Sequence, residues 1–202
     1  MQHARSQITR DKLVDAALNS VYRHGHKGTT TQQICEGTGL TQGALFRHFE
    51  TKNEVLHSAF SRALERILEH CDASLHASRG QADAAHRLWQ LAESTAAGRC
   101  HLVAIELAVA ARTQPELHRL LHEEALHYRD RFVALLGAHF PEYASHREFI
   151  PVVLSLITQY VGMAVTNCLL FTHSPSSERT EWARRVLQSE IARIAGTPCP
   201  TI

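Results

Sequence analysis

The segment from residue 41 to residue 48 reads Thr-Gln-Gly-Ala-Leu-Phe-Arg-His, and it mixes polar, small and large apolar side chains. If the segment is helical, Leu45 and Phe49 are four residues apart and face the core. Gln42, Arg47 and His48 then point outward. Glutamine pairs well with the edge of adenine and arginine with the edge of guanine, so these side chains are suited to reading bases in a major groove.

Small and hydroxyl-bearing residues near this segment extend the same chemistry. Glycine or alanine can approach a thymine methyl group, whereas phosphates are bound by hydroxyls, cations and the N–H groups at helix N-termini. Taken singly, Thr30 is better explained as a helix cap and Lys52 as a solvated charge, but together they would flank the segment. The candidate nucleic-acid contacts are Thr30, Gln32, Thr41, Gln42, Gly43, Ala44, Phe46, Arg47, His48 and Lys52.

Helices must position these residues, because apolar residues recur at helical spacing almost everywhere and alternation with a period of two is nearly absent. The 202 residues include only 10 Gly and 6 Pro, which leaves few turns for a sheet architecture. Thr30 with Gln33 and Thr51 with Glu54 each form a capping-box pattern. The spacing predicts an all-α fold with helices up to residue 25 and over 30–38, 41–48, 51–75, 81–97, 100–112, 115–139, 151–172 and 178–195.

Composition excludes several classes of protein. With 44% hydrophobic and 20% charged residues and a net charge of +1, the chain is neither disordered nor strongly basic. Residues 1–52 nevertheless hold seven Lys or Arg against four Asp or Glu. The five cysteines form no C-x-x-C pair, which favours a reducing cytoplasm. Residues 149–171 are long enough to span a bilayer, but their polar residues favour a buried helix, so we expect neither a membrane partner nor a signal peptide.

The fifteen histidines raise the alternative of a metal-dependent helical protein or enzyme. His122 and His127 enclose a pair of glutamates, but five residues place them on different faces of a helix, unlike the four-residue spacing of H-E-x-x-H. His118 and His122 have that spacing and could share a metal, although such pairs are usually ordinary surface residues. Nucleophile-elbow, phosphate-loop and dinucleotide-binding motifs are absent, so we predict no enzyme, no cofactor and no metal.

The C-terminal half carries the candidate ligand and dimer residues. Two predicted helices, 151–172 and 178–195, have more apolar surface than a small domain covers, which favours a four-helix interface with a second copy. The alternative is a core within one chain. Residues placed at this interface are Gly162, Trp182, Val186 and Ile194. Polar-capable residues in apolar surroundings make a candidate pocket of Trp89, Glu106, Tyr128, Gln159 and Asn167. An outward position or an interhelical ion pair explains Glu106 equally well.

Residues 10–56 resemble the DNA-binding domain of the TetR (tetracycline-repressor-like) transcriptional regulators. The resemblance rests on Leu13, Ala16, Ala17, Gly25, Thr29, Thr30, Ile34, Gly39, Leu45, Phe46, Arg47, His48, Phe49, Lys52, Val55 and Leu56. It implies about nine helices and a homodimer on palindromic operator DNA. It also implies a DNA-binding domain over residues 1–52, linked by the fourth helix to a ligand-binding and dimerisation domain over 53–202. The expected function is a ligand-responsive regulator, a repressor that a small molecule releases from double-stranded DNA.

The chain departs from the family pattern at four positions. Phe46 stands where tyrosine is usual, which removes a hydroxyl from the phosphate contacts. Cys35 and Gly37 replace alanines, and Gly37 is expected to cost the second helix up to about 1 kcal/mol. Asn53 replaces a common glutamate.

Overall fold

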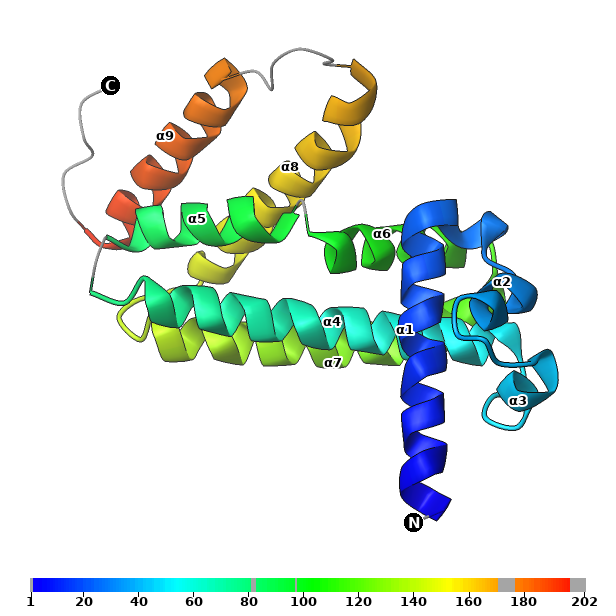
Figure 1. Cartoon of the computed structure of the whole chain (residues 1–202). Coiled ribbons are helices and arrows are strands. Elements are labelled where there is room, and N and C mark those ends of the chain that lie inside the picture. The colour runs from blue at the N-terminus through cyan, green and yellow to red at the C-terminus, as the bar shows by residue number, and fades with distance from the viewer. Residues whose placement is uncertain (1, 81–82, 97, 171–176, 197–202) are drawn as a thin grey trace. The chain divides into compact units, whose positions relative to one another are not determined.

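The computed structural model describes residues 2–80, 83–96, 98–170 and 177–196, and over these residues it is built from helices (Figure 1). The predicted all-α fold is therefore confirmed for the described part of the chain. Its helices are α1 (Gln2–Gly28), α2 (Thr31–Glu36), α3 (Gln42–Phe46), α4 (Lys52–Ala77), α5 (Ala84–Ala96), α6 (Arg99–Ala111), α7 (Pro115–His139), α8 (Phe149–Leu170) and α9 (Ser177–Ile194).

The first helix does not stop at Gly25 as the sequence predicts. Gly25 adopts φ 67° and ψ 177°, a conformation that essentially only glycine tolerates, and α1 resumes to Gly28 beyond this kink. The backbone N–H of Thr29 donates to the carbonyl of Gly25 at 3.1 Å, which ties the extra turn to the kink. The glycine thus bends the helix and does not end it.

Two other predicted helix starts also differ in detail. α8 begins at Phe149, two residues before Pro151, because the first N–H groups of a helix have no intrahelical acceptor and a proline there loses nothing. At α4 the N–H of Glu54 donates to Thr51 Oγ1 at 3.2 Å, as expected. The Glu54 carboxylate, however, accepts from the N–H of Glu50 at 2.8 Å, so the predicted reciprocal box with Thr51 is not formed.

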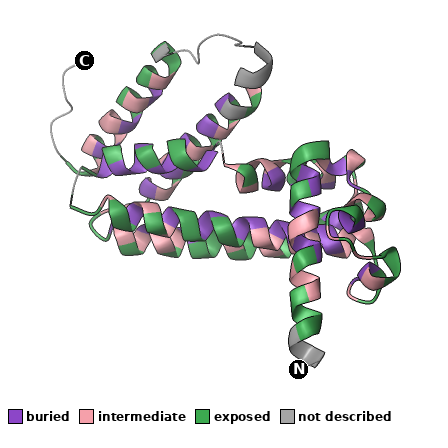
Figure 2. Ribbon diagram, viewed as in Figure 1, coloured by how far each residue is buried: buried purple, intermediate pink, exposed green. Residues whose placement is uncertain are grey.

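One compact unit comprises the residues up to Ile67 together with Arg99–Arg129. Its core includes Leu13, Ala17, Leu45 and Leu56, each with none of its surface exposed. Figure 2 shows purple bands, which mark buried residues, along α1 and α4. The apolar stripe of α1 that the sequence predicts is therefore the stripe that is buried.

The second compact unit comprises Leu68–Gly98 and the residues from Asp130 onward. Here α5, α8 and α9 pack together over a core that includes Leu88, Phe149 and Leu187. Arg87 is buried in this unit, where its guanidinium lies 4.4 Å from the centre of the Phe140 ring. Both units contain part of α4 and part of α7, and the functional division at residue 52 stays a prediction.

The apolar segment that begins at Phe149 forms α8, whose residues Val153, Leu156 and Met163 are buried within the second unit. Among the described residues, we find no helix that combines the length and the apolar character needed to cross a membrane.

Candidate nucleic-acid interface

A reciprocal cap begins α2. The N–H of Gln33 donates to Thr30 Oγ1 at 3.2 Å, and the N–H of Thr30 donates to Gln33 Oε1 at 3.3 Å. This confirms the predicted capping box, and Thr30 remains exposed at the surface. Gln32 is also exposed, but its amide donates to Glu36 one turn later at 3.0 Å. A contact between Gln32 and DNA would therefore begin from a side chain that already has a partner.

A tight turn joins α2 to α3. Thr38 Oγ1 donates to the carbonyl of Cys35 at 2.9 Å and accepts from the N–H of Leu40 at 3.2 Å. Gly39 has a φ of 70°. Gly37 lies at the C-cap, after the last residue of α2, so the cost expected for a glycine inside this helix does not arise.

The side chains of α3 divide between the core and the surface. Leu45 is fully buried and Phe49 is 3% exposed, which confirms that these two residues face inward. Gln42, Gly43 and Arg47 are exposed. The hydroxyl of Thr41, itself exposed, caps the helix by accepting from the N–H of Ala44 at 3.2 Å. Exposed and intermediate residues predominate on α3 in Figure 2, so its outer face is open to a partner.

Three further predicted contacts lie at or near this outer face. Ala44 and His48 are partly exposed, and Phe46 is 49% exposed despite its large apolar ring. An aromatic ring left in water on a short helix is suited to an apolar contact with a sugar or a thymine methyl group.

Ion pairs that sequence reasoning missed hold α1 against α4. Arg62 pairs with Asp11 and Asp15, and Arg66 pairs with Asp15 at 2.8 Å. The hydrogen bond from Arg62 holds the pKa of Asp11 below its ordinary value. The spacing of these residues in the sequence could have indicated the ion pairs. The two aspartates are four residues apart, and so are the two arginines, so each pair lies on one face of its helix.

Arg10 adds a second link between these helices. Its guanidinium donates to Ser58 Oγ at 3.0 Å and lies 4.9 Å from the centre of the Phe49 ring. Phe49 lies three residues after the end of α3, and its ring faces inward. Arg10 therefore contacts the buried side of the segment that carries the exposed Arg47.

Lys52 is not a freely solvated charge. Its Nζ donates to the carbonyl of His26 at 3.3 Å, and partial burial lowers the pKa of the lysine. One residue further on, Asn53 donates to Glu116 of α7 at 2.8 Å. A glutamate at position 53 would bring a second negative charge to Glu116, which explains the departure from the family pattern.

Comparisons with known proteins agree with the helix-turn-helix geometry of α2 and α3. A family model described as "Bacterial regulatory proteins, tetR family" matches residues 13–59. An uncharacterized HTH-type transcriptional regulator of Mycobacterium tuberculosis is 29% identical over 175 residues, which cover 84% of this chain and 87% of the relative. The regulator CymR of Pseudomonas putida is 28% identical over 65% of this chain and 64% of its own length. The chain belongs to the TetR family.

Solved structures show the same fold. A putative TetR-family regulator of Mesorhizobium loti superimposes with a TM-score of 0.70 at 14% identity, over 94% of this chain and 98% of the other. The multidrug binding protein EbrR, in complex with imidazole, gives a TM-score of 0.63 at 24% identity, over 95% and 96%. The chain is therefore a helix-turn-helix, DNA-binding transcriptional regulator, and the family is not one of enzymes.

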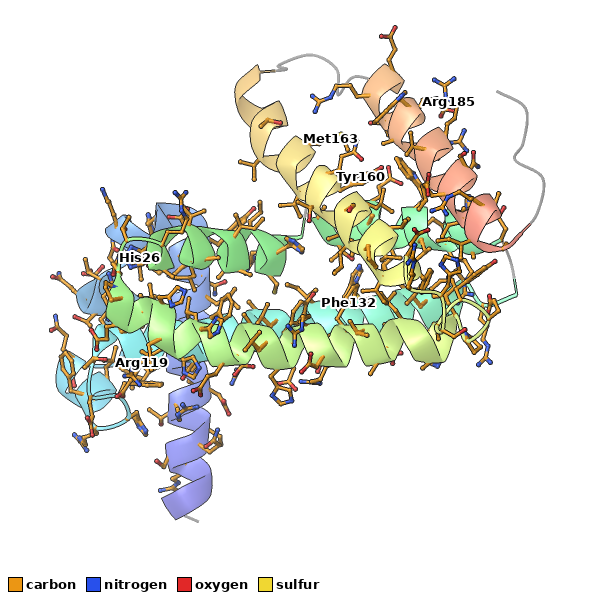
Figure 3. All side chains as sticks on the ribbon, turned by 180° about the vertical axis from the view of Figure 1, so that it is seen from behind. His26, Arg119, Phe132, Tyr160, Met163 and Arg185 are labelled. Carbon is orange, nitrogen blue, oxygen red and sulfur yellow. The ribbon has the colours of Figure 1, made fainter. Side chains whose placement is uncertain are left out.

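In this TetR-family chain Glu106 has a partner within the first unit. Its Oε1 accepts a hydrogen bond from the backbone N–H of His26 at 2.8 Å (Figure 3, where His26 is labelled). Burial is the main cause that lowers the pKa of His26, and Lys52 lowers it further. Glu106 is exposed, which agrees with the outward position that the sequence allows, and its interhelical partner is a backbone amide and not the cation of an ion pair.

The other candidate pocket residues lie on several helices. Trp89 of α5 is buried and meets Tyr160 of α8 edge-on at 4.9 Å between ring centres. Tyr128 is partly exposed on α7, and Gln159 is exposed on α8. Asn167 also belongs to α8, but its side chain lies outside the described residues. Trp89 and Gln159 belong to the second unit, whereas Glu106 and Tyr128 belong to the first, so a common pocket stays a prediction.

A groove of about 300 Å³ runs between α8 and α9, and it is lined by Gln159 and Val186 among others. Trp182 is 55% exposed and Val186 is 40% exposed, whereas Leu187 is buried in the core. Ile194 is partly exposed, and Gly162 is exposed with no other atom near the place of a Cβ. The residues predicted to form a dimer interface are thus accessible on these two helices.

Proposed function

We propose that this regulator is a homodimeric repressor that binds a palindromic operator through α3 and leaves it when a small molecule binds. Residues 1–52 would form the DNA-binding domain, and residues 53–202 would hold the ligand and the partner subunit. The observation that carries the proposal is the division of α3 into a buried side, with Leu45, and an exposed side, with Gln42 and Arg47.

The exposed side supports direct reading of bases. Gln42 and Arg47 are matched to adenine and guanine, and Gly43 and Ala44 between them leave room for a close approach. We assign the specificity of the protein to these four residues. One α3 per subunit would enter the major groove of one half-site.

A second set of residues supports contact with phosphates. The exposed hydroxyls of Thr30 and Thr41 accept from helix N–H groups, and each keeps its own proton for donation. Lys52 has three N–H groups, of which one donates to His26, so two remain for a phosphate oxygen. These contacts would be independent of sequence and sensitive to salt.

Dimerisation is supported by the surface of α8 and α9. Val186 lines a groove whose lining residues are mostly apolar. Trp182 is exposed on the same helix, and aromatic residues are typical anchors of protein interfaces. A two-fold interface of four helices would place two copies of α3 on one face of the DNA, where half-sites are roughly 34–36 Å apart or somewhat more. Such a regulator would act in the cytoplasm.

Release by a small molecule is supported by a related protein. EbrR, which shares the fold, is described as a multidrug binding protein and was solved with ethidium and with imidazole. A ligand can shift this regulator off its operator only if it binds the DNA-free arrangement of the two subunits more tightly. An apolar ligand with one polar or cationic group suits the candidate pocket residues.

Selection of bound sequences from random duplex DNA tests the proposal directly. We expect enrichment of an inverted repeat with two equal half-sites. The Arg47→Ala variant, carried through the same selection, should lose preference at one position in each half-site. An enriched single site without symmetry would contradict the dimer, and the absence of enrichment would contradict sequence-specific binding.

A further inference from the structure

The ends of α4 and α7 bring two histidines and an aspartate together in the second unit. Asp72 and His76 are one turn apart on the last part of α4, and His139 is the last residue of α7. Among the residues that the structure describes, these three form the one group of His, Cys, Asp or Glu side chains with at least three ligand atoms in range of a metal ion.

The ligand atoms are close enough to share one ion. His139 Nε2 lies 2.7 Å from Asp72 Oδ1, His76 Nδ1 lies 3.2 Å from the same oxygen, and all three atoms lie within 4.8 Å of one another. In a tetrahedral zinc site with metal–ligand bonds of about 2.0–2.1 Å, neighbouring ligand atoms are roughly 3.3 Å apart. Small side-chain rotations would therefore bring the present spacing to that of a bound ion.

The donor set defines the class of ion. Two imidazole nitrogens and one carboxylate oxygen are ligands of zinc and of related divalent transition metals, whereas calcium and magnesium prefer oxygen alone. We propose that Asp72, His76 and His139 bind one divalent transition metal ion of the Zn²⁺ class, with solvent completing its coordination. The proposal does not depend on the operator or on the proposed repressor function.

The burial of the three side chains suits such a site. The His139 side chain is 7% exposed, so its position is set by packing before any ion binds. Asp72 and His76 have side chains that are 51% and 59% exposed, which gives an ion a path from solvent and leaves room for a water ligand. The two imidazole rings, which come from different helices, meet edge-on at 4.6 Å between centres. His76 Nδ1 also lies 3.0 Å from the carbonyl oxygen of Asp72, and a bound ion would replace this contact.

The backbone near the site also favours a cation, with one exception, a buried guanidinium that keeps its positive charge. The carbonyl ends of α4 and α7 give the region partial negative charge in addition to that of Asp72. The exception is Arg87, whose guanidinium donates to the carbonyl of Leu75 at 3.2 Å and to that of His139 at 3.5 Å. Arg87 is directed at the backbone of these helix ends and at the Phe140 ring.

A second histidine pair on α7 provides a matched control. His118 and His122 are four residues apart, exposed, and stacked with 5.5 Å between ring centres. Within the described residues no carboxylate or third histidine joins them into a group of three. Replacing both with alanine removes two imidazoles from the same protein and leaves the proposed site intact.

The experiment is a titration of the metal-free protein with Zn²⁺ by calorimetry, repeated with Co²⁺ to follow its visible absorption. We expect one tight ion per chain and a tetrahedral cobalt spectrum. Asp72→Asn and His76→Gln should each lower the affinity at least about 100-fold, because even partners of ligands contribute 10–100-fold. The His118→Ala/His122→Ala variant should bind as the wild type does.

Thermal unfolding separates loss of the site from loss of the fold. Each metal-free variant should still unfold cooperatively, with a Tm at or slightly below that of the metal-free wild type because Asp72 also contacts His139 and His76. Zn²⁺ should raise the Tm of the wild type alone. Asp72 and His76 are suitable positions because both side chains are half-exposed, whereas a change at the buried His139 could disturb packing. Wild-type affinity in either variant, or tight binding lost only in the control, would overturn the proposal.

Discussion

The carboxylate of Glu106 accepts a hydrogen bond from the backbone N–H of His26, 2.8 Å away and eighty residues earlier in the chain. The contact lies one residue beyond the kink at Gly25, where α1 changes direction. The carbonyl of the same His26 accepts from Lys52 Nζ. His26 of α1 is thus held by α6 through its N–H group and by α4 through its carbonyl group. Through these two contacts, a movement of α6 or α4 would act on the segment that precedes the proposed DNA-binding residues.

Gly25→Ala should lower the free energy of unfolding more than Gly39→Ala. Both glycines have positive φ, but a Cβ at Gly25 would lie 2.9 Å from Glu106 Oε1, whereas a Cβ at Gly39 would meet nothing within 4 Å. We expect about 1–2 kcal/mol for Gly39→Ala from backbone strain alone. Gly25→Ala should cost at least about 1 kcal/mol more, because φ 67° with ψ 177° is tolerated essentially only by glycine and because Glu106 would have to move away from the N–H of His26. Urea denaturation of the two variants measures the difference, and equal losses would contradict the close packing of Glu106 on the kink.

Arg47→Ala should weaken operator binding and relax the preference at one base pair. The side chain is exposed on the outer face of α3, where it can reach a guanine edge, and such a contact contributes about 1–3 kcal/mol of discrimination. Fluorescence anisotropy with operator and single-base variants measures the effect. Arg112→Ala removes the same charge at an exposed position that follows α6, outside the proposed interface, and serves as the control. A uniform loss over all base variants would make Arg47 a phosphate contact instead.

Lys52→Ala should weaken binding to every duplex alike and reduce the slope of log K against log salt by about one unit. Because Lys52 also donates to the His26 carbonyl, the variant should lose some stability as well. Lys27→Ala, at an exposed position in the last turn of α1, controls for net charge. A drop in stability with an unaltered salt slope would restrict Lys52 to its structural role.

Local patterns in the sequence predicted the parts of the site that depend on neighbours along the chain. Leu45 and Phe49 are buried as their four-residue spacing requires, and Thr30 and Gln33 form the expected cap. The orientation of α3 follows from such spacing, because a short helix with two large apolar residues has one side to bury.

Contacts between distant segments could not be predicted in the same way. No spacing connects Glu106 with His26, or Asp72 with His139, because their proximity depends on which helices pack together. The sequence left Glu106 open between a ligand pocket, an outward position and an ion pair, because it interrupts an apolar run. Its partner in the fold is the backbone N–H of His26, next to the kink at Gly25. Backbone donors do not show in a sequence, so a lone carboxylate on an apolar helix is hard to interpret without the fold.

Trp182→Asp should convert the proposed dimer to monomers. Trp182 is 55% exposed on α9, and a carboxylate buried at this position in a two-fold interface would have no counter-charge. Light scattering at several concentrations measures the mass. Val109→Asp makes the same kind of change at a side chain that is 54% exposed on α6, outside the proposed interface. If Trp182→Asp remained dimeric, the interface would lie elsewhere.

The stability of the fold should fall as the pH drops below about 6.5, in part because of His101. Burial lowers the pKa of its imidazole, and its Nδ1 is buried without a hydrogen-bond partner among the described residues. The folded state therefore resists protonation that the unfolded chain accepts. Above the pKa that His101 has in the unfolded chain, the stabilising contribution of its neutral imidazole is fully present. As the pH falls from there towards the lower pKa of the folded chain, this contribution to the free energy of unfolding is lost.

His101→Leu isolates this contribution. The variant has no imidazole to protonate and no buried nitrogen without a partner, so it should be as stable as the wild type or more so at pH 8, and its advantage should grow at pH 5.5. Urea denaturation at both pH values gives the two differences in the free energy of unfolding. His26, whose pKa burial also lowers, should maintain part of the acid sensitivity in the variant. An advantage that is the same at both pH values would show that His101 protonates equally in the folded and unfolded chains.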